Sequence, residues 1–70
     1  MITYEVSETA DAHRRYFENP VDAVFIATEL SLRQGVCVFV EQYDTDLKKY
    51  VGPWFTVTGG KMVRQEVVKS

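Results

Sequence analysis

Cys37 and His13 are the residues of this chain whose types fit nucleophilic catalysis, because a thiol acts as a nucleophile when a base lies beside it. They are the only cysteine and the only histidine of the sequence. No recognisable nucleophile motif surrounds either residue, and Cys37 lies in a valine-rich run that is typical of small buried residues. One histidine and one cysteine also provide no spacing of metal ligands. We therefore predict no catalytic residue, no metal site and no cofactor.

Three further groups of polar residues match ligand-binding or catalytic patterns only in part. Asp44 and Asp46 are not followed by the further carboxylate and the glycine of a calcium-binding loop. The Gly-Gly-Lys segment at 59–61 lacks the first glycine and the hydroxyl residue of a phosphate-binding loop. Asp22 and Glu29 lie on the solvated side of a predicted helix, where a surface role is expected and not acid–base catalysis. We predict turns at the first two segments and a protein that is not an enzyme.

Length and composition describe a single small domain that spans residues 1–70. Hydrophobic residues make up 46% of the chain and charged residues 26%, which is typical of folded globular proteins and not of disordered or collagen-like chains. A chain of this size buries roughly 60% of the surface that its unfolded form exposes, so its core is small. Ten acidic and eight basic residues give a net charge of −2, which argues against a duplex-binding protein that depends on phosphate contacts.

Neither a membrane protein nor an exported protein is expected. The longest unbroken apolar runs are Ala23–Ala27 and Val36–Val40, and both are much shorter than the ~20 residues that span a bilayer. The N-terminal residues contain no basic stretch followed by an apolar run, which a secretory signal needs. The lone cysteine, Cys37, forms no intramolecular disulfide. We therefore expect a soluble protein of the cytoplasm without membrane contact.

The N-terminal residues are predicted to form one or two strands. Apolar and polar residues alternate from Ile2 to Ser7, a pattern that is typical of a strand. Two alternatives remain open for the segment that follows. Ser7 caps a short helix that ends at Phe17, or a turn precedes a second strand over residues 13–17. We favour the strand because the helix would be only weakly amphipathic.

A helix at Pro20–Gln34 is the clearest local signal in the sequence. Asn19 is a favourable N-cap, and the proline in the first turn loses no hydrogen bond there. Asp22 in the first turn and Arg33 in the last turn both oppose the helix dipole. Gly35 supplies the left-handed residue that ends many helices.

Three stretches rich in β-branched and aromatic residues follow the helix, at 36–43, 48–58 and 61–68. Gly52-Pro53 interrupts the second stretch, and this strand is expected to be bulged there or to lie at a sheet edge because proline donates no hydrogen bond. Gly59-Gly60 predicts a two-residue hairpin turn. The predicted fold is α+β: one α-helix packed on an antiparallel β-sheet of three to five strands, in the order β(β)αβββ.

The predicted helix is apolar on two opposed sides, although a single sheet covers only one of them. The side expected to face the sheet carries Ala23, Ile26, Ala27 and Leu30. The other side carries Val21, Phe25 and Leu32. We predict that these three residues form a dimerisation surface, because two such helices pack antiparallel about a two-fold axis.

The predicted meander has the same excess of apolar surface. Alternation along its strands places four aromatic residues on the side away from the helix, where an antiparallel sheet usually meets water: Phe39, Tyr43, Tyr50 and Trp54. We predict that these four bind a partner protein, because aromatic residues dominate protein interfaces. The alternative is that the N-terminal segment or the turn at 44–49 covers part of this side.

Single-stranded nucleic acid is the second candidate ligand of the aromatic side, because bases stack on aromatic rings beside basic residues. Two segments combine these residue types, at 14–16 and at 48–50. Three acidic residues expected among the same strands, Glu5, Glu41 and Glu66, argue against this alternative.

The layout of the chain resembles that of small acidic proteins that bacteriophages make to bind and redirect host machines. The likeness lies in the order of elements: a strand, then Asn-Pro-x-Asp-Ala opening an Ala-x-x-x-Ala helix, then a valine-rich meander. The resemblance implies a non-enzymatic inhibitor or adaptor that acts on a host polymerase, nuclease or defence complex. It covers layout and carries over no individual residue. We therefore predict a protein-binding module that self-associates through the helix.

Overall fold

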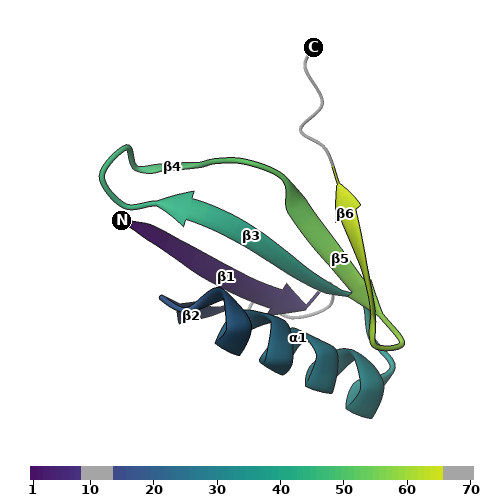
Figure 1. The fold of residues 1–70 in the computed structure, drawn as a ribbon. Coiled ribbons are helices and arrows are strands. Elements are labelled where there is room, and N and C mark those ends of the chain that lie inside the picture. The colour runs from purple at the N-terminus through teal and green to yellow at the C-terminus, as the bar shows by residue number, and fades with distance from the viewer. Residues whose placement is uncertain (9–13, 66–70) are drawn as a thin grey trace.

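A computed structural model describes residues 1–8 and 14–65 of the chain. Within them the elements are β1 (Ile2–Glu8), β2 (Arg14–Phe17), α1 (Pro20–Gln34), β3 (Val38–Asp44), β4 (Lys49–Tyr50), β5 (Trp54–Thr58) and β6 (Lys61–Gln65). Figure 1 shows α1 lying along one face of the sheet. The predicted α+β class, with one helix packed on an antiparallel sheet, is confirmed.

The strands of the described residues form one six-stranded sheet in the order β2-β1-β3-β5-β6, and β4 pairs with the end of β3. The opening strand therefore lies inside the sheet, between β2 and β3. The number of strands exceeds the predicted three to five because the stretch 48–58 forms two strands. Gly52, with φ +70°, and Pro53 separate β4 from β5. Gln42 stabilises this break, because its side-chain amide donates to the Pro53 carbonyl at 2.9 Å.

The alternatives left open at the sequence level are decided by these strands. Residues 14–17 form a strand, as favoured, while His13 lies outside the described residues. The proline-containing stretch, predicted to be one strand that is bulged or lies at a sheet edge, is instead divided in two at Gly52-Pro53. Among the described strands β4 pairs only with β3, whereas β5 pairs with β3 and β6. The closing strand is described as far as Gln65, so the rest of the predicted stretch 61–68 lies outside the described residues.

Helix α1 begins and ends at the predicted residues. Asn19 caps it, with its side-chain oxygen accepting from the Val21 amide at 2.9 Å, and Gly35 ends it with φ +65°. Ala23 and Ala27 are fully buried against the sheet. Their small side chains allow the helix backbone to approach the strands closely. Within the part of the chain that the structure describes, α1 falls short of the length and hydrophobicity of a membrane-spanning helix.

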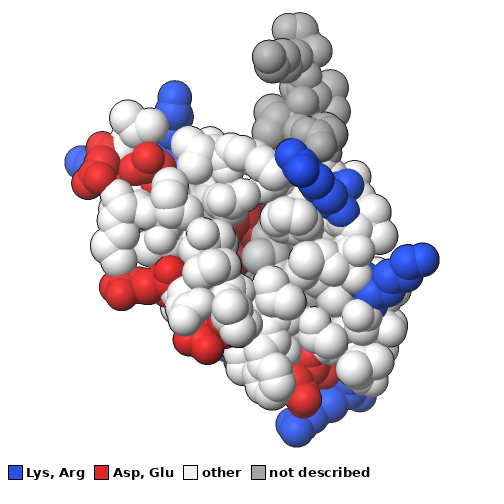
Figure 2. All heavy atoms as spheres, viewed as in Figure 1, with Lys and Arg blue, Asp and Glu red and all other residues white. Residues whose placement is uncertain are grey.

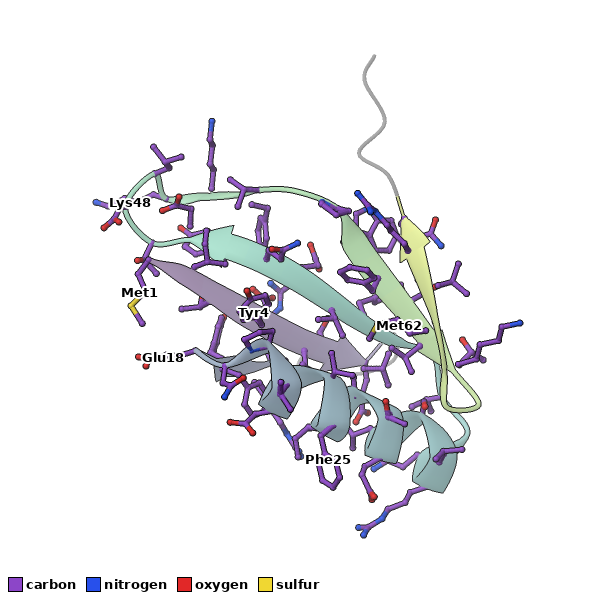
Figure 3. All side chains as sticks on the ribbon, viewed as in Figure 1. Met1, Tyr4, Glu18, Phe25, Lys48 and Met62 are labelled. Carbon is purple, nitrogen blue, oxygen red and sulfur yellow. The ribbon has the colours of Figure 1, made fainter. Side chains whose placement is uncertain are left out.

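The core lies between α1 and the sheet. Its buried members are Val6, Ala23, Ala27, Val38, Val40 and Val57. Larger residues complete it at its margins, and Figure 3 shows Tyr4 and Met62 between the helix and the strands. Phe25 extends from the opposite side of α1 (Figure 3). The fully buried part of the layer between helix and sheet is therefore built from valine and alanine, with larger side chains only at its margins.

Candidate functional site

The four aromatic residues predicted to bind a partner lie on the face of the sheet away from α1, in two contacting pairs. The rings of Phe39 on β3 and Trp54 on β5 have centroids 5.7 Å apart. The rings of Tyr43 on β3 and Tyr50 on β4 meet edge to face, with centroids 5.1 Å apart. Strand alternation places Phe39 and Trp54 here because their neighbours Val38, Val40 and Phe55 point into the core. Tyr43 follows Phe39 at an even spacing on β3, and Tyr50 lies directly opposite Tyr43. We call these four residues the aromatic sheet face.

Glu5 is a buried carboxylate among these rings, with 2% of its surface exposed. Arg14 Nη1 donates to Glu5 Oε1 at 2.7 Å, and the Tyr50 hydroxyl donates to Glu5 Oε2 at 2.7 Å. Both carboxylate oxygens therefore have a partner, as a buried charge requires. The negative charge of Glu5 raises the pKa of the Arg14 guanidinium. The hydrogen bond to Glu5 raises the pKa of Tyr50 to about 12.

Glu41 is a second carboxylate on the same face, directly opposite Glu5 in the pairing of β1 with β3. It is half-buried, and no hydrogen bond or ion pair to another described residue holds it. Burial and, after it, the negative charge of Glu5 raise the pKa of Glu41, while Arg14 acts in the opposite direction. The positive charge of Arg14 thus acts on both carboxylates, but its guanidinium forms an ion pair with Glu5.

Two hollows in the surface adjoin these carboxylates. The first has a volume of about 260 Å³ and is lined by Phe39, Glu41 and Trp54. The second has a volume of about 320 Å³ and is lined by Glu5, Tyr16, Tyr43 and Tyr50. Figure 2 shows that much of the surface in one view of the molecule is uncharged, with Lys, Arg, Asp and Glu gathered mainly around its margin. A carboxylate beside aromatic rings is suited to holding a cationic group that also has an apolar or flat surface.

The three residues predicted for dimerisation are exposed on the side of α1 away from the sheet. Val21, Phe25 and Leu32 expose 70%, 62% and 61% of their surfaces, respectively. Leu32 also approaches the turn between β5 and β6, where a Cβ atom on Gly60 would meet its side chain at 2.9 Å. The described residues therefore leave an apolar stripe on the helix without a covering element.

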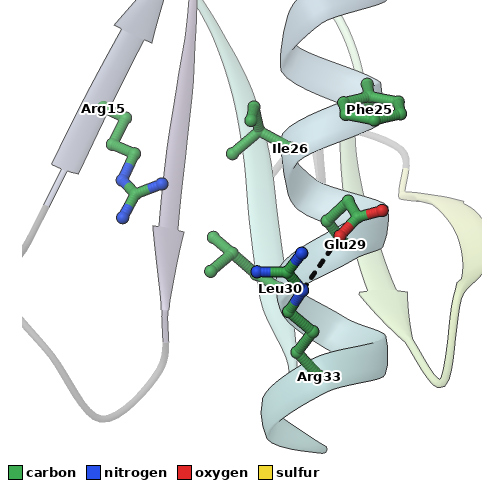
Figure 4. Close-up of a pocket in the computed structure, with 6 residues that line it drawn as sticks. All are labelled: Arg15, Phe25, Ile26, Glu29, Leu30 and Arg33. Carbon is green, nitrogen blue, oxygen red and sulfur yellow. Dashed lines mark ion pairs between the residues drawn. The ribbon is translucent and has the colours of Figure 1, made fainter.

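A shallow groove of about 210 Å³ runs between α1 and β2 beside this stripe (Figure 4). It is lined by Arg15, Phe25, Ile26, Glu29, Leu30 and Arg33. Glu29 and Arg33 form an ion pair across one helical turn, at 3.1 Å. Both side chains of the pair are substantially exposed, so we treat it as a surface contact and not as a binding centre.

The described residues considered for catalysis or metal binding form no common site. Cys37 is half-buried just before β3, and His13 lies outside the described residues. Asp44 accepts hydrogen bonds from the Asp46 and Leu47 amides at 2.9 and 3.1 Å, so it shapes the turn after β3. These hydrogen bonds lower the pKa of Asp44, with the Leu47 amide the larger cause. Over residues 1–8 and 14–65, no three His, Cys, Asp or Glu side chains gather closely enough to hold a metal ion.

Several members of the site were not predicted as site residues. Glu5 and Glu41 were expected among the strands only as residues unfavourable to nucleic acid, and Arg14 as part of a basic segment. Alternation along β3 signals that Glu41 shares a face with Phe39. The pairing of Glu5 with Glu41 depends on strand order, which has no local signal.

Comparison of the chain with protein-family models, with curated proteins and with solved structures gave no match. The fold and the site define a small α+β protein that carries an aromatic and acidic surface on its sheet and an apolar stripe on its helix.

Proposed function

We propose that this protein is a small, non-enzymatic binding module that recognises a partner protein through the aromatic sheet face. The observation that carries the proposal is the Phe39–Trp54 ring pair, which lies beside the Glu41 carboxylate on the face opposite to the helix. Large aromatic residues that line a hollow are the usual anchors of protein interfaces. In keeping with the phage resemblance and the lone cysteine, the proposed role is that of an inhibitor or adaptor of a host protein complex in the cytoplasm.

A protein partner fits this face better than single-stranded nucleic acid. Stacking on Trp54 brings the phosphate backbone of a nucleic acid close to Glu41 and Glu5, and like charges repel at such distances. Arg14, the basic residue nearest to them, already binds Glu5. A titration of Trp54 fluorescence with oligonucleotides at low salt separates the two ligands, because stacking quenches indole emission and added salt reverses the quenching.

Capture of partners on three forms of the protein tests the proposal. Tagged wild type, Trp54→Gln and Leu47→Gln are exposed to the same bacterial lysate, and bound proteins are quantified by mass spectrometry. Leu47 is a matched control because it is a large apolar residue, 60% exposed, in the turn before β4. We expect a protein that wild type and Leu47→Gln retain and that Trp54→Gln loses. Equal recovery on all three forms contradicts the proposal.

We further propose that the apolar stripe Val21, Phe25 and Leu32 joins two copies of this chain. The charges at the two ends of α1 favour that occupant, because Asp22 lies in the first turn and Arg33 in the last turn. In an antiparallel pair of helices, Asp22 of each copy lies near Arg33 of the other. Self-association of this kind leaves both aromatic sheet faces free.

A further inference from the structure

We propose that the hollow lined by Phe39, Glu41 and Trp54 receives the guanidinium group of an arginine side chain from the partner protein. This inference deepens the proposed function, on which it depends, by naming the chemical group that the aromatic sheet face recognises.

Two tilted aromatic rings and one carboxylate form the hollow. Trp54 on β5 and Phe39 on β3 have their ring planes inclined at 59°. The register that pairs Val40 with Phe55 brings Trp54 alongside Glu41 on the same face. The rings and the carboxylate therefore line one hollow of about 260 Å³.

Negative charge exceeds positive charge around the Glu5–Glu41 pair. Glu5 and Glu41 contribute two negative charges from opposite positions, and Arg14 contributes one positive charge that the ion pair with Glu5 uses. Within the described residues, Glu41 has neither an ion pair nor a hydrogen bond to its carboxylate. A cationic side chain of the partner protein would compensate the negative charge of Glu41, with which Arg14 forms no ion pair.

The flat walls of the hollow suit the side chain of arginine better than that of lysine. A guanidinium is flat, so it stacks on the face of an indole or phenyl ring while its N–H groups donate to a carboxylate. An ammonium is a compact and strongly hydrated charge, and it loses more hydration free energy on entering an apolar hollow. A hollow with two aromatic walls and one carboxylate therefore favours the guanidinium.

The test uses three blocked tripeptides, Gly-Arg-Gly, Gly-citrulline-Gly and Gly-Lys-Gly, titrated into ¹⁵N-labelled full-length protein. Citrulline has nearly the shape of arginine but no charge. We expect the arginine peptide to shift the Trp54 indole signal and the amide signals of Phe39 and Glu41 in a saturable manner. The lysine peptide should bind more weakly, and the citrulline peptide should give no saturable shift.

Two variants show whether the binding depends on Glu41. Glu41→Gln retains the size of the side chain and removes its charge, and should weaken binding of the arginine peptide about tenfold. Glu18→Gln alters an exposed carboxylate just before α1 and should bind as wild type does. The inference is overturned if the arginine peptide gives no saturable shift, if citrulline binds equally well, or if Glu41→Gln binds as tightly as wild type.

The outcomes for this inference and for the proposed function are distinguishable. If the peptide fails to bind while capture of a partner still depends on Trp54, the recognised group is not arginine and the binding module stands. If the arginine peptide binds through Glu41 while no protein is captured through Trp54, the hollow accepts a guanidinium and the proposed protein partner is wrong.

Discussion

Glu5 and Glu41 occupy directly opposite positions on β1 and β3, so two carboxylates lie side by side on one face of the sheet. Like charges in this arrangement destabilise a sheet. Arg14 and Tyr50 satisfy the oxygens of Glu5, whereas Glu41 is half-buried without an equivalent partner among the described residues. Glu5 is therefore buried with a partner for each oxygen, whereas Glu41 is half-buried beside a like charge. Changes at the two carboxylates should therefore have different effects on the free energy of unfolding.

Glu41→Gln should stabilise the protein at neutral pH, by roughly 0.2–1 kcal/mol, the range typical of cross-strand pairs. Burial raises the pKa of Glu41 in the folded state above its ordinary value of 4.5, so the folded state holds the proton more tightly than the unfolded state. The contribution of Glu41 to stability therefore falls as the pH rises from 4.5 through its folded-state pKa. Urea unfolding of both proteins across this pH range measures the difference.

The gain from Glu41→Gln should disappear below pH 4.5, where Glu41 is protonated in both states. Glu18→Gln is the matched control, because Glu18 is exposed and should change stability by no more than about 0.5 kcal/mol. A Glu41→Gln protein that is less stable than wild type at neutral pH contradicts the electrostatic assignment of this face.

Tyr50→Phe should destabilise the protein by about 1.5 kcal/mol, because it removes one of the two hydrogen-bond partners of a buried carboxylate. Tyr43→Phe is the control, since Tyr43 contacts the ring of Tyr50 and makes no hydrogen bond to Glu5. Unfolding in urea at neutral pH compares the two variants. Equal losses for both would show that the hydroxyl of Tyr50 contributes nothing specific.

The raised pKa of Tyr50 also predicts how stability and tyrosinate absorbance change at alkaline pH. The pKa of Tyr50 is raised from 10 to about 12 in the folded protein, so the folded state retains this proton over a range in which the unfolded state has lost it. The stabilisation is fully present below pH 10 and is lost as the pH rises through about 12. A spectroscopic titration of tyrosinate absorbance should show a late step that Tyr50→Phe lacks. Retention of that step in Tyr50→Phe assigns it to another residue.

The local elements of this fold are predictable because their signals are short in sequence. Asn19 and Gly35 define the ends of α1, and alternation along β3 separates core residues from Phe39 and Tyr43. The strand order has no such signal, because β1 pairs with β3 across the whole of α1. The pairing of Glu5 with Glu41, and with it the charge of the site, is therefore visible only in three dimensions.

Ser31→Ala should destabilise the protein by about 1 kcal/mol, because the half-buried Gly60 amide loses the buried Ser31 hydroxyl as its acceptor. The Ser31 hydroxyl donates to the Thr28 carbonyl at 2.9 Å and accepts from the Gly60 amide at 2.9 Å, which joins α1 to the β5–β6 turn. Thr28→Ala is the control, since the Thr28 hydroxyl bonds only within the helix, to the Val24 carbonyl. Hydrogen exchange of the Gly60 amide should accelerate in Ser31→Ala alone. Unchanged exchange contradicts the role of this link.

Phe25→Glu should convert a dimer into a monomer if the apolar stripe of α1 joins two copies. Phe25 lies between Val21 and Leu32 on the exposed side of the helix, so in a two-fold arrangement each copy contributes one buried glutamate to the same interface. Two like charges taken out of water at close range are strongly unfavourable. Leu47→Glu introduces the same charge at an equally exposed apolar residue outside the stripe and should leave the dimer intact. Sedimentation velocity over a series of protein concentrations measures the mass of each form. A wild type that stays monomeric throughout, or a Phe25→Glu protein that still dimerises, removes the helix stripe as the interface.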